Sequence, residues 1–277
     1  MAAVPVFFSD QMVADSGGYS PSAGKPAQAV GSWFDAGFDI EVHCPAEATI
    51  DDLCMAHHPR YVMNVLDCVI SNGHGNRSQE LANTLPWTSG SMLSAARWAM
   101  TNGGIACSPT SGFHHAGFSH GGGFCTFNGL MVTAGVLLES GEACKVGILD
   151  LDMHYGDGTD DIIKVLGLED SVAHFTGGAR KREAESFLRQ LPKIMTQMFA
   201  DCDVLLYQAG ADPHEDDPLG GWMSTEQMRS RDRIVFREAA GMGLPVAWNL
   251  AGGYQRNFRK VLDIHDNTMR EACRYQV

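Results

Sequence analysis

Two carboxylates and an imidazole stand at alternate positions in the stretch GILDLDMHYGDGTDD, residues 147–161. Asp150, Asp152 and His154 follow the apolar run KVGIL, which has the composition of a buried strand. Because side chains share a face at every second position of a strand, we expect Asp152 and His154 to point to the same side. Carboxylate oxygen and imidazole nitrogen both bind divalent metal ions, so the stretch predicts part of a metal site.

Three further apolar runs are each followed directly by glycine and by residues that bind metals or move protons. These residues are His114 and His115 after residues 104–108, Asp212 after residues 203–210, and Tyr254 after residues 244–252. In open α/β sheets, ligands bind beyond the carboxyl ends of the strands. We therefore expect the four strand ends to meet at one rim and to bring these side chains together.

Asp152, His154 and Asp212 would supply two oxygen ligands and one nitrogen ligand, which leaves a fourth position for water. This composition is typical of catalytic zinc sites, whereas structural zinc sites take four protein ligands, commonly with thiolates. Cys125 is the one cysteine that stands near these three residues, so a structural zinc site with several thiolates is disfavoured. The imidazole of His154 argues against magnesium as the bound ion. An Asp-x-Asp-x-His stretch alone is equally compatible with a solvated turn, and paired histidines are commonly structural. Their occurrence together at strand ends favours the site.

The runs that must position these residues alternate with segments of helical period. Strands are expected over residues 4–8, 104–108, 145–151, 170–175, 203–210 and 244–252. The best helix candidates cover residues 89–100, 128–140, 183–200 and 225–241, and two short helices are expected around a turn at His58–Pro59. This alternation predicts a mostly parallel sheet covered by helices on both faces.

Capping residues define the expected helix ends. Ser89 and Thr225 are predicted N-caps, and Gly103 and Gly241 are predicted C-terminal stops. Pro192 is expected to start or kink its helix rather than lie in the middle, because proline lacks the N–H that a helix interior uses.

Composition sets the class of protein. The chain has 277 residues, 44% of them hydrophobic, which is enough for a single α/β domain over residues 1–277. A formal net charge of −13 argues against nucleic-acid or anionic-membrane partners and leaves a cationic substrate open. Eight scattered cysteines without a C-x-x-C pair favour reduced thiols. The start lacks signal-peptide features and no apolar run reaches about 18 residues, so we expect a soluble, cytoplasmic protein.

Five segments, GFHHAG, GGGFCTFN, DLDMHYGDGT, QAGADPHEDDPLGG and LAGGY, lie in this order between residues 112 and 254. They resemble the motifs of the zinc-dependent histone deacetylase family, which includes bacterial acetoin-utilisation proteins and acetylpolyamine amidohydrolases. The resemblance implies the arginase-like fold, a three-layer αβα domain with a mainly parallel sheet. It also implies that Asp152, His154 and Asp212 are ligands of Zn²⁺.

The same resemblance assigns the residues that would move protons. It makes His114 and His115 the proton-transfer pair, with Asp150 as the partner of His114 and Asp157 as the partner of His115. It makes Tyr254 the catalytic tyrosine. Asp150 would also line a site for a monovalent cation such as K⁺.

The resemblance implies substrate-binding positions as well. Phe124, with Gly123 beside it, matches one wall of a tunnel that takes an acyl-lysine chain. Leu219 lies where some polyamine-preferring relatives carry an acid. His214, Glu215, Asp216 and Asp217 are interpreted as loop structure, and a structural role is preferred for His43, His57, His74, His120 and His265.

The chain departs from the family pattern between residues 171 and 186. This segment is shorter than usual, so the second aromatic wall stays unassigned, with Phe175 as a candidate. Val172-Ala173-His174 stands in for a Ser-Leu-His motif, so the cation site is expected to lose one side-chain oxygen. A shorter rim would admit a larger acyl group, and brief amino-terminal loops favour a small bacterial or phage-like form.

The expected function is removal of an acyl group, expected to be acetyl, from acylated lysine in proteins or peptides. Deacylation of a small acylated amine such as acetylpolyamine is the alternative, which the net charge favours and Leu219 disfavours. A third hypothesis is a catalytically silent binding module, against which the retention of every ligand and of Tyr254 argues. The sequence leaves an oligomer open.

Overall fold

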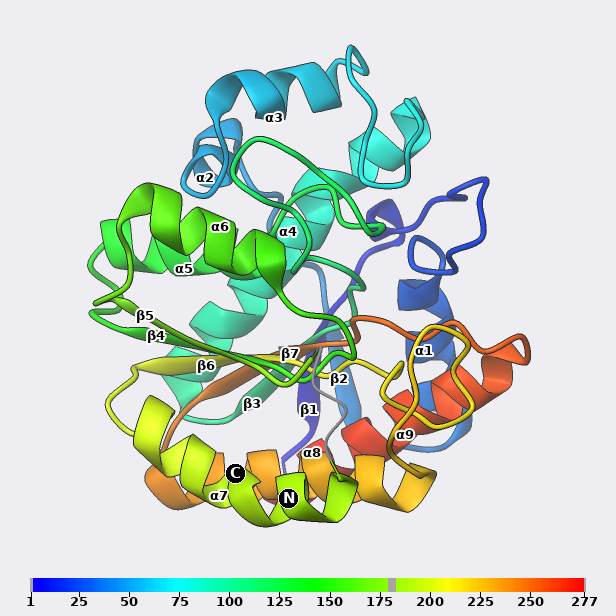
Figure 1. Ribbon diagram of the computed structural model, residues 1–277, viewed down its shortest axis with the longest axis vertical. Helices are drawn as coiled ribbons and strands as arrows, with labels where there is room; N and C mark the ends of the chain where they lie inside the picture. The colour runs from blue at the N-terminus through cyan, green and yellow to red at the C-terminus, as the bar shows by residue number, and fades with distance from the viewer. Residues whose placement is uncertain (1, 179–182, 277) are drawn as a thin grey trace.

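The computed structural model describes residues 2–178 and 183–276, and a seven-stranded sheet forms its centre (Figure 1). The strands follow the order β2-β1-β3-β7-β6-β4-β5, and every described pairing between neighbours is parallel. They are β1 (Val4–Phe7), β2 (Ile40–His43), β3 (Ile105–Ser108), β4 (Val146–Asp150), β5 (Val172–Thr176), β6 (Val204–Gln208) and β7 (Val246–Asn249).

Helices cover both faces of the sheet and complete a three-layer αβα arrangement (Figure 1). One layer contains α1 (Lys25–Asp35), α7 (Ala184–Phe199), α8 (Thr225–Met242) and α9 (Phe258–Tyr275). The other contains α2 (Ile50–Cys54), α3 (Pro59–Leu66), α4 (Gln79–Asn102), α5 (Gly129–Glu139) and α6 (Asp157–Leu166). A short 3₁₀ turn, η1 (Asp10–Met12), follows β1. The expected fold class is confirmed.

Alternating side chains on the central strands fill two separate cores. On β6, Leu205 and Tyr207 pack into the core beneath α7, α8 and α9, whereas Val204 and Leu206 pack into the core beneath α4 and α5. All four side chains are fully buried. A strand that is apolar on both faces reads as a continuous apolar run, which is why the sequence predicts the central strands well.

The six expected strands are present, each shifted by no more than a few residues at its ends. The sequence pattern did not indicate β2, the edge strand beside β1. Its four residues are half-buried or exposed, with Glu41 and Val42 facing solvent, so it lacks the apolar run that marks the inner strands.

Two predicted helix starts are wrong. Ser89 is buried inside α4, which begins ten residues earlier than expected and is capped by Ser78, whose Oγ accepts a hydrogen bond from the N–H of Leu81. Thr225 is the first residue of α8, and Ser224 is its N-cap. The two short helices are confirmed: α2 and α3 flank the turn, and His58 caps α3 ahead of Pro59.

Of the two predicted C-terminal helix ends, one is confirmed and one is wrong. Gly103 ends α4 in the left-handed region (φ 73°), as expected, but α8 passes through Gly241 and ends at Gly243. Pro192 lies inside α7, so it does not start the helix, and the prediction that it would not occupy the middle is wrong. Phe187, Leu191 and other apolar side chains bury one face of α7 on both sides of Pro192. That burial outweighs the backbone hydrogen bond lost at proline.

No helix in the described part of the chain is long and apolar enough to cross a membrane.

Candidate active site

Four neighbouring parallel strands end at the same edge of the sheet. In the order β3-β7-β6-β4, their carboxyl ends lead into the loops that carry the polar residues picked out from the sequence. The expectation that these four ends share one rim is therefore confirmed. The rim brings together residues that are separated by up to about 140 positions in the chain.

Asp152, His154 and Asp212 form a cluster that we call the metal group. One potential ligand atom from each lies within 4.8 Å of the others. His154 Nδ1 is 3.2 Å from Asp152 Oδ1 and 3.0 Å from Asp212 Oδ2. The two carboxylates are buried, whereas the His154 side chain is 37% exposed, so the group meets solvent on its imidazole side.

A turn, not a strand, places Asp152 and His154. β4 ends at Asp150, so the prediction that strand alternation aligns the two side chains is wrong. Instead, carboxylates fold the loop through backbone N–H groups. Asp150 Oδ1 accepts from the N–H of Asp152 (3.1 Å), Asp152 Oδ1 from that of His154 (2.9 Å), and Asp212 Oδ1 from that of Met153 (3.0 Å). The acids thus shape the turn that presents them.

A glycine makes room for the metal group. The N–H of Gly252 donates to Asp152 Oδ2 at 2.8 Å. A Cβ at this position would lie 2.6 Å from Asp152 Oδ2 and closer still to Asp212 Oδ2. Any larger residue at position 252 would therefore push the loop after β7 away from the two carboxylates.

The residues of the metal group fit a divalent cation. Asp212 Oδ2 is buried and accepts no hydrogen bond from any described residue, although His154 Nδ1 lies near it. Burial and the neighbouring Asp152 raise the pKa of Asp212, because two carboxylates without a counter-charge repel each other. A tetrahedral ion with bonds of about 2.0–2.1 Å would separate neighbouring ligand atoms by about 3.3 Å. The distances from His154 Nδ1 to the two carboxylates match that spacing.

Each histidine of the pair has a carboxylate at Nδ1. His114 Nδ1 is 2.7 Å from Asp150 Oδ2, and His115 Nδ1 is 2.6 Å from Asp157 Oδ1. The two imidazole centroids are 4.0 Å apart. A carboxylate at Nδ1 holds a proton there and leaves Nε2 as the acceptor of a neutral ring. The geometry pairs these residues as the sequence analysis expected.

The two imidazoles are driven toward different protonation states. Burial disfavours the charged form of His114, but the carboxylates of Asp150 and Asp152 outweigh it and raise the pKa of His114 to about 9. Burial and the nearby His114 lower the pKa of His115. A cation in the metal group would weaken the contribution of Asp152. The arrangement favours a neutral His115, which can accept a proton.

Tyr254 is fixed through its backbone. Its N–H donates to Asp217 Oδ2 at 2.7 Å, and Asp217 Oδ1 accepts from the N–H of Leu219 at 3.0 Å. Asp217 thus ties the loop after β6 to the loop after β7. Burial, reinforced by the charges of Asp152 and Asp212, raises the pKa of the Tyr254 phenol far above its usual range. The hydroxyl therefore remains a hydrogen-bond donor.

Sequence reasoning missed Lys25. Its ammonium is fully buried and donates to the carbonyls of Ala251 (2.6 Å) and Gly252 (3.1 Å), in the loop that leads to Tyr254. Burial lowers the pKa of Lys25 to about 8, while Asp212 and Asp152 counteract it. Lys25 starts α1, far from every motif, and a lysine in a polar stretch carries no signal of burial. Its role becomes visible in the fold, where α1 meets the loop after β7.

His57 supports the loop that carries the histidine pair. Its Nδ1 is 2.9 Å from the carbonyl of Gly117, and its Nε2 accepts from the N–H of Asn128 at 2.8 Å. Asn128 in turn donates to the carbonyl of Ala116 at 3.2 Å. These bonds assign the proton of a neutral His57 to Nδ1 and give this residue the structural role that the sequence analysis preferred.

The expected substrate-binding residues occupy different surroundings. Phe124 lies 5.8 Å from Tyr254 and 5.7 Å from His74, measured between ring centroids. Gly123 adjoins His115, because a Cβ there would lie 2.5 Å from His115 Cδ2. Leu219 is 42% exposed and lies outside these ring contacts. His74, for which a structural role was preferred, is thus a neighbour of Phe124.

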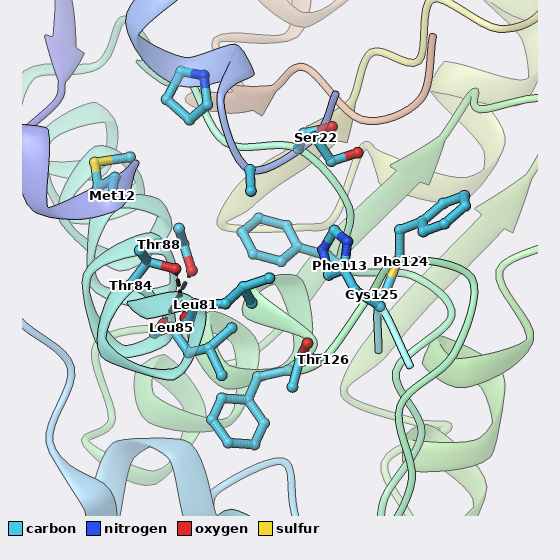
Figure 2. Close-up of a pocket in the computed structure, with 15 residues that line it drawn as sticks. Met12, Ser22, Leu81, Thr84, Leu85, Thr88, Phe113, Phe124, Cys125 and Thr126 are labelled. Atoms are coloured by element: carbon cyan, nitrogen blue, oxygen red, sulfur yellow. Dashed lines mark hydrogen bonds between the residues drawn. The ribbon is translucent and has the colours of Figure 1, made fainter. Parts of the chain in front are cut away.

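A small cavity lies on the inner side of Phe124. Figure 2 shows Leu81, Thr84, Leu85 and Thr88 of α4 on one side, and Phe113, Phe124, Cys125 and Thr126 on the other. Its volume is about 40 Å³, enough for a few water molecules. No residue of the metal group lines this cavity, so it is not the place where the metal group would meet the amide bond of a substrate.

Residues 179–182 of the segment 171–186 lie outside the described part, and the second wall of the site stays unassigned. Phe175, the candidate for that wall, lies on β5 (Val172–Thr176) and packs, half-buried, against the core beneath α7, α8 and α9. Val172 is the first residue of β5 and His174 its middle residue, and the residue level with Asp150 is Thr176. Thr176 thus offers a hydroxyl at the strand end next to Asp150, and the expected loss of one side-chain oxygen at a cation site stays a prediction.

Comparison with known proteins gives a consistent family. A family model described as "Histone deacetylase domain" matches residues 27–175 and 174–268. Histone deacetylase 2 of Arabidopsis thaliana is 28% identical over 206 residues, which cover 66% of this chain and 53% of that protein. Acetylpolyamine amidohydrolase of Mycoplana ramosa is 29% identical over 171 residues, 51% of this chain and 49% of that protein. The chain thus aligns with about half the length of these two relatives.

The fold has close counterparts among solved structures. The crystal structure of the HDA15 HD domain superposes with a TM-score of 0.80 over 98% of this chain and 88% of that chain, at 20% identity. At this identity the likeness shows a shared fold.

If the metal group holds a divalent ion, Asp212→Ala will lose it. The substitution removes a ligand and leaves Asp152 as the one carboxylate of the metal group. Metal analysis of purified protein is expected to give about one ion per wild-type chain and almost none for Asp212→Ala. His115→Ala, which removes a neighbouring imidazole outside the metal group, is the matched control and keeps its ion. Equal metal content in Asp212→Ala and wild type would refute the ligand assignment.

His57 predicts a pH dependence of folding. Burial lowers its pKa to about 4, opposed by the bonds to the Gly117 region, whereas an unfolded chain has a histidine pKa of about 6.5. The unfolded state therefore binds more protons between these values, so this stabilisation is complete above pH 6.5 and is lost as the pH falls toward 4. The loss is about 3 kcal/mol from this residue.

Urea titrations at several pH values test this directly. Between pH 6.5 and pH 4, His57→Gln should lose less unfolding free energy than wild type, although it starts less stable because two hydrogen bonds are missing. Parallel slopes for the two proteins would contradict the prediction.

Proposed function

The chain belongs to the histone deacetylase domain family, and we propose that it is a zinc-dependent hydrolytic deacetylase that removes acetyl groups from acylated lysine in proteins or peptides. The observation that carries this proposal is the metal group, in which two buried carboxylates and a half-exposed imidazole surround a common point beside His115 and Tyr254. We also propose that residues 1–277 act as one catalytic domain.

Zinc is the ion that we propose for the metal group. One nitrogen and two oxygen ligands with an open side are the composition of a catalytic zinc site, and the imidazole disfavours magnesium. Zinc, when bound, would lower the pKa of a coordinated water and polarise the amide carbonyl of the substrate. K⁺ near Asp150 and Thr176 remains a further proposal, supported by the oxygen atoms of these two strand ends.

The chain's own residues would move the protons. His115, kept neutral and with Asp157 at Nδ1, would accept the proton of the attacking water at Nε2 and later deliver it to the leaving amine. His114, with Asp150 at Nδ1, would lie beside His115 and tune its charge. The Tyr254 hydroxyl would donate a hydrogen bond to the oxyanion that forms from the carbonyl oxygen.

The alternative substrate is a small acylated amine such as acetylpolyamine. The net charge of −13 favours a cationic substrate, and one relative is named an acetylpolyamine amidohydrolase. Leu219 favours acyl-lysine, because a leucine offers no charge to a second ammonium group. Eight free cysteines support our proposal of a reducing, cytoplasmic location.

Turnover of an acetyl-lysine peptide and of acetylspermidine by the same zinc-loaded preparation separates these substrates. We expect a higher kcat/KM for the peptide. A preference for acetylspermidine would move the assignment to the alternative. Hydrolysis of neither, by protein that contains stoichiometric zinc, would favour the silent binding module.

His115→Ala and Tyr254→Phe are each expected to lower kcat by about 100- to 1,000-fold, because each removes a group that acts on the transition state. Zinc content should stay at the wild-type level in both, since neither residue belongs to the metal group. Rates within about threefold of wild type in either variant would remove that residue from the mechanism.

A further inference from the structure

The side chain of Tyr254 has few restraints of its own. Its backbone N–H is held by Asp217, but its hydroxyl makes no hydrogen bond with any residue that the structure describes. The direction of the hydroxyl therefore depends on what holds the ring. Two aromatic rings contact the Tyr254 ring, one from Phe124 and one from Tyr19.

The two rings contact Tyr254 differently. The Phe124 ring is tilted by 44° at a centroid distance of 5.8 Å. The Tyr19 ring is nearly parallel to the Tyr254 ring, at 14° and 6.3 Å. Offset parallel rings at this distance attract each other and resist rotation of either ring. Tyr19 thus restrains the plane of the Tyr254 ring. Phe124 contacts the same ring at an angle and does not stack on it.

Tyr19 is presented by a structured loop. Residues 13–24 connect η1 to α1, and the N–H of Ala14 donates to the carbonyl of Ala23 at 3.2 Å, which closes the loop at its base. Ser16 Oγ donates to the carbonyl of Ser20 at 2.9 Å, and Asn76 Nδ2 donates to the carbonyl of Ser16 at 3.1 Å. These bonds fix the backbone around Tyr19, whose ring is nevertheless exposed.

Core packing does not explain the exposed ring. Tyr19 is 64% exposed, the largest value among the exposed large hydrophobic side chains of the described residues. A single exposed aromatic side chain is ordinary on a protein surface. Its stacking on Tyr254, the tyrosine beside the metal group, is not ordinary.

Resting on the proposed function, we propose that Tyr19 is a positioning residue for the reaction, whose stacked ring keeps the Tyr254 hydroxyl turned toward the metal group. Tyr19 acts through Tyr254 and takes no part in proton transfer. Its hydroxyl is dispensable for this role, because the restraint comes from the ring face.

The kinetic test compares Tyr19→Ala with Tyr19→Phe on the preferred substrate. Loss of one stacked ring should lower kcat by about two- to tenfold and change KM by less than about twofold. Tyr19→Phe keeps the ring and should restore most of the rate. Phe34→Ala is the matched control, since Phe34 is also exposed (58%) but lies on α1 without a ring contact among the described residues. An unchanged kcat in Tyr19→Ala would overturn the proposal.

A double-mutant cycle separates positioning from substrate contact. In a Tyr254→Phe background the hydroxyl is absent, so Tyr19→Ala should cause little further loss of kcat. A Tyr19 that touches substrate would instead lower kcat/KM equally in both backgrounds and raise KM. That pattern would overturn the positioning role.

A structural readout keeps this test independent of the proposed function. Crystal structures of wild type and Tyr19→Ala should show one Tyr254 ring orientation in wild type and a rotated or mixed orientation in the variant. If wild type hydrolyses neither acetyl-lysine peptide nor acetylspermidine, the proposed function fails while this comparison still decides the role of Tyr19. An unmoved Tyr254 ring in Tyr19→Ala would overturn the proposal.

Discussion

Two like charges buried side by side are the constraint on which the site depends. Asp152 and Asp212 lie within reach of one common atom and are almost completely removed from water. Such a pair is costly unless a cation lies between its members. Much of the surrounding structure serves these two carboxylates: backbone N–H groups donate to them, a glycine gives them room, and His154 completes the cluster.

The parallel sheet makes this concentration of charge possible. Four adjacent strands end at one rim, and their loops supply the acids, the histidine pair and the tyrosine. Helices on both faces bury the strands in two apolar cores, which fix the positions of the strand ends. The loops that follow the strands are therefore available to carry the polar residues of the site. Asp217 joins the loops after β6 and β7, and Lys25 joins α1 to the loop after β7, so the backbone of Tyr254 is fixed relative to the carboxylates.

The sequence predicts those parts of this arrangement that have local signals. Buried strands appear as apolar runs, and Asp150, Asp152, His154 and Asp212 stand out because polar groups follow such runs directly. The edge strand β2 lacks an apolar run, and the start of α4 lies ten residues before the predicted cap, because packing extends the helix beyond its clearest pattern. Contacts between distant segments leave no signal at all, which is why Lys25 and the stacking of Tyr19 on Tyr254 emerge from the fold alone.

X-ray absorption spectroscopy at the zinc edge, on protein loaded with one equivalent of zinc, tests the central claim most directly. A single ion bound by Asp152, His154 and Asp212 predicts a first shell of nitrogen and oxygen at about 2.0–2.1 Å, with one imidazole and without sulfur. In the Asp212→Ala variant, the zinc spectrum should instead match the spectrum of zinc in buffer. A sulfur shell at about 2.3 Å, or more than one imidazole, would place the ion elsewhere and contradict the account.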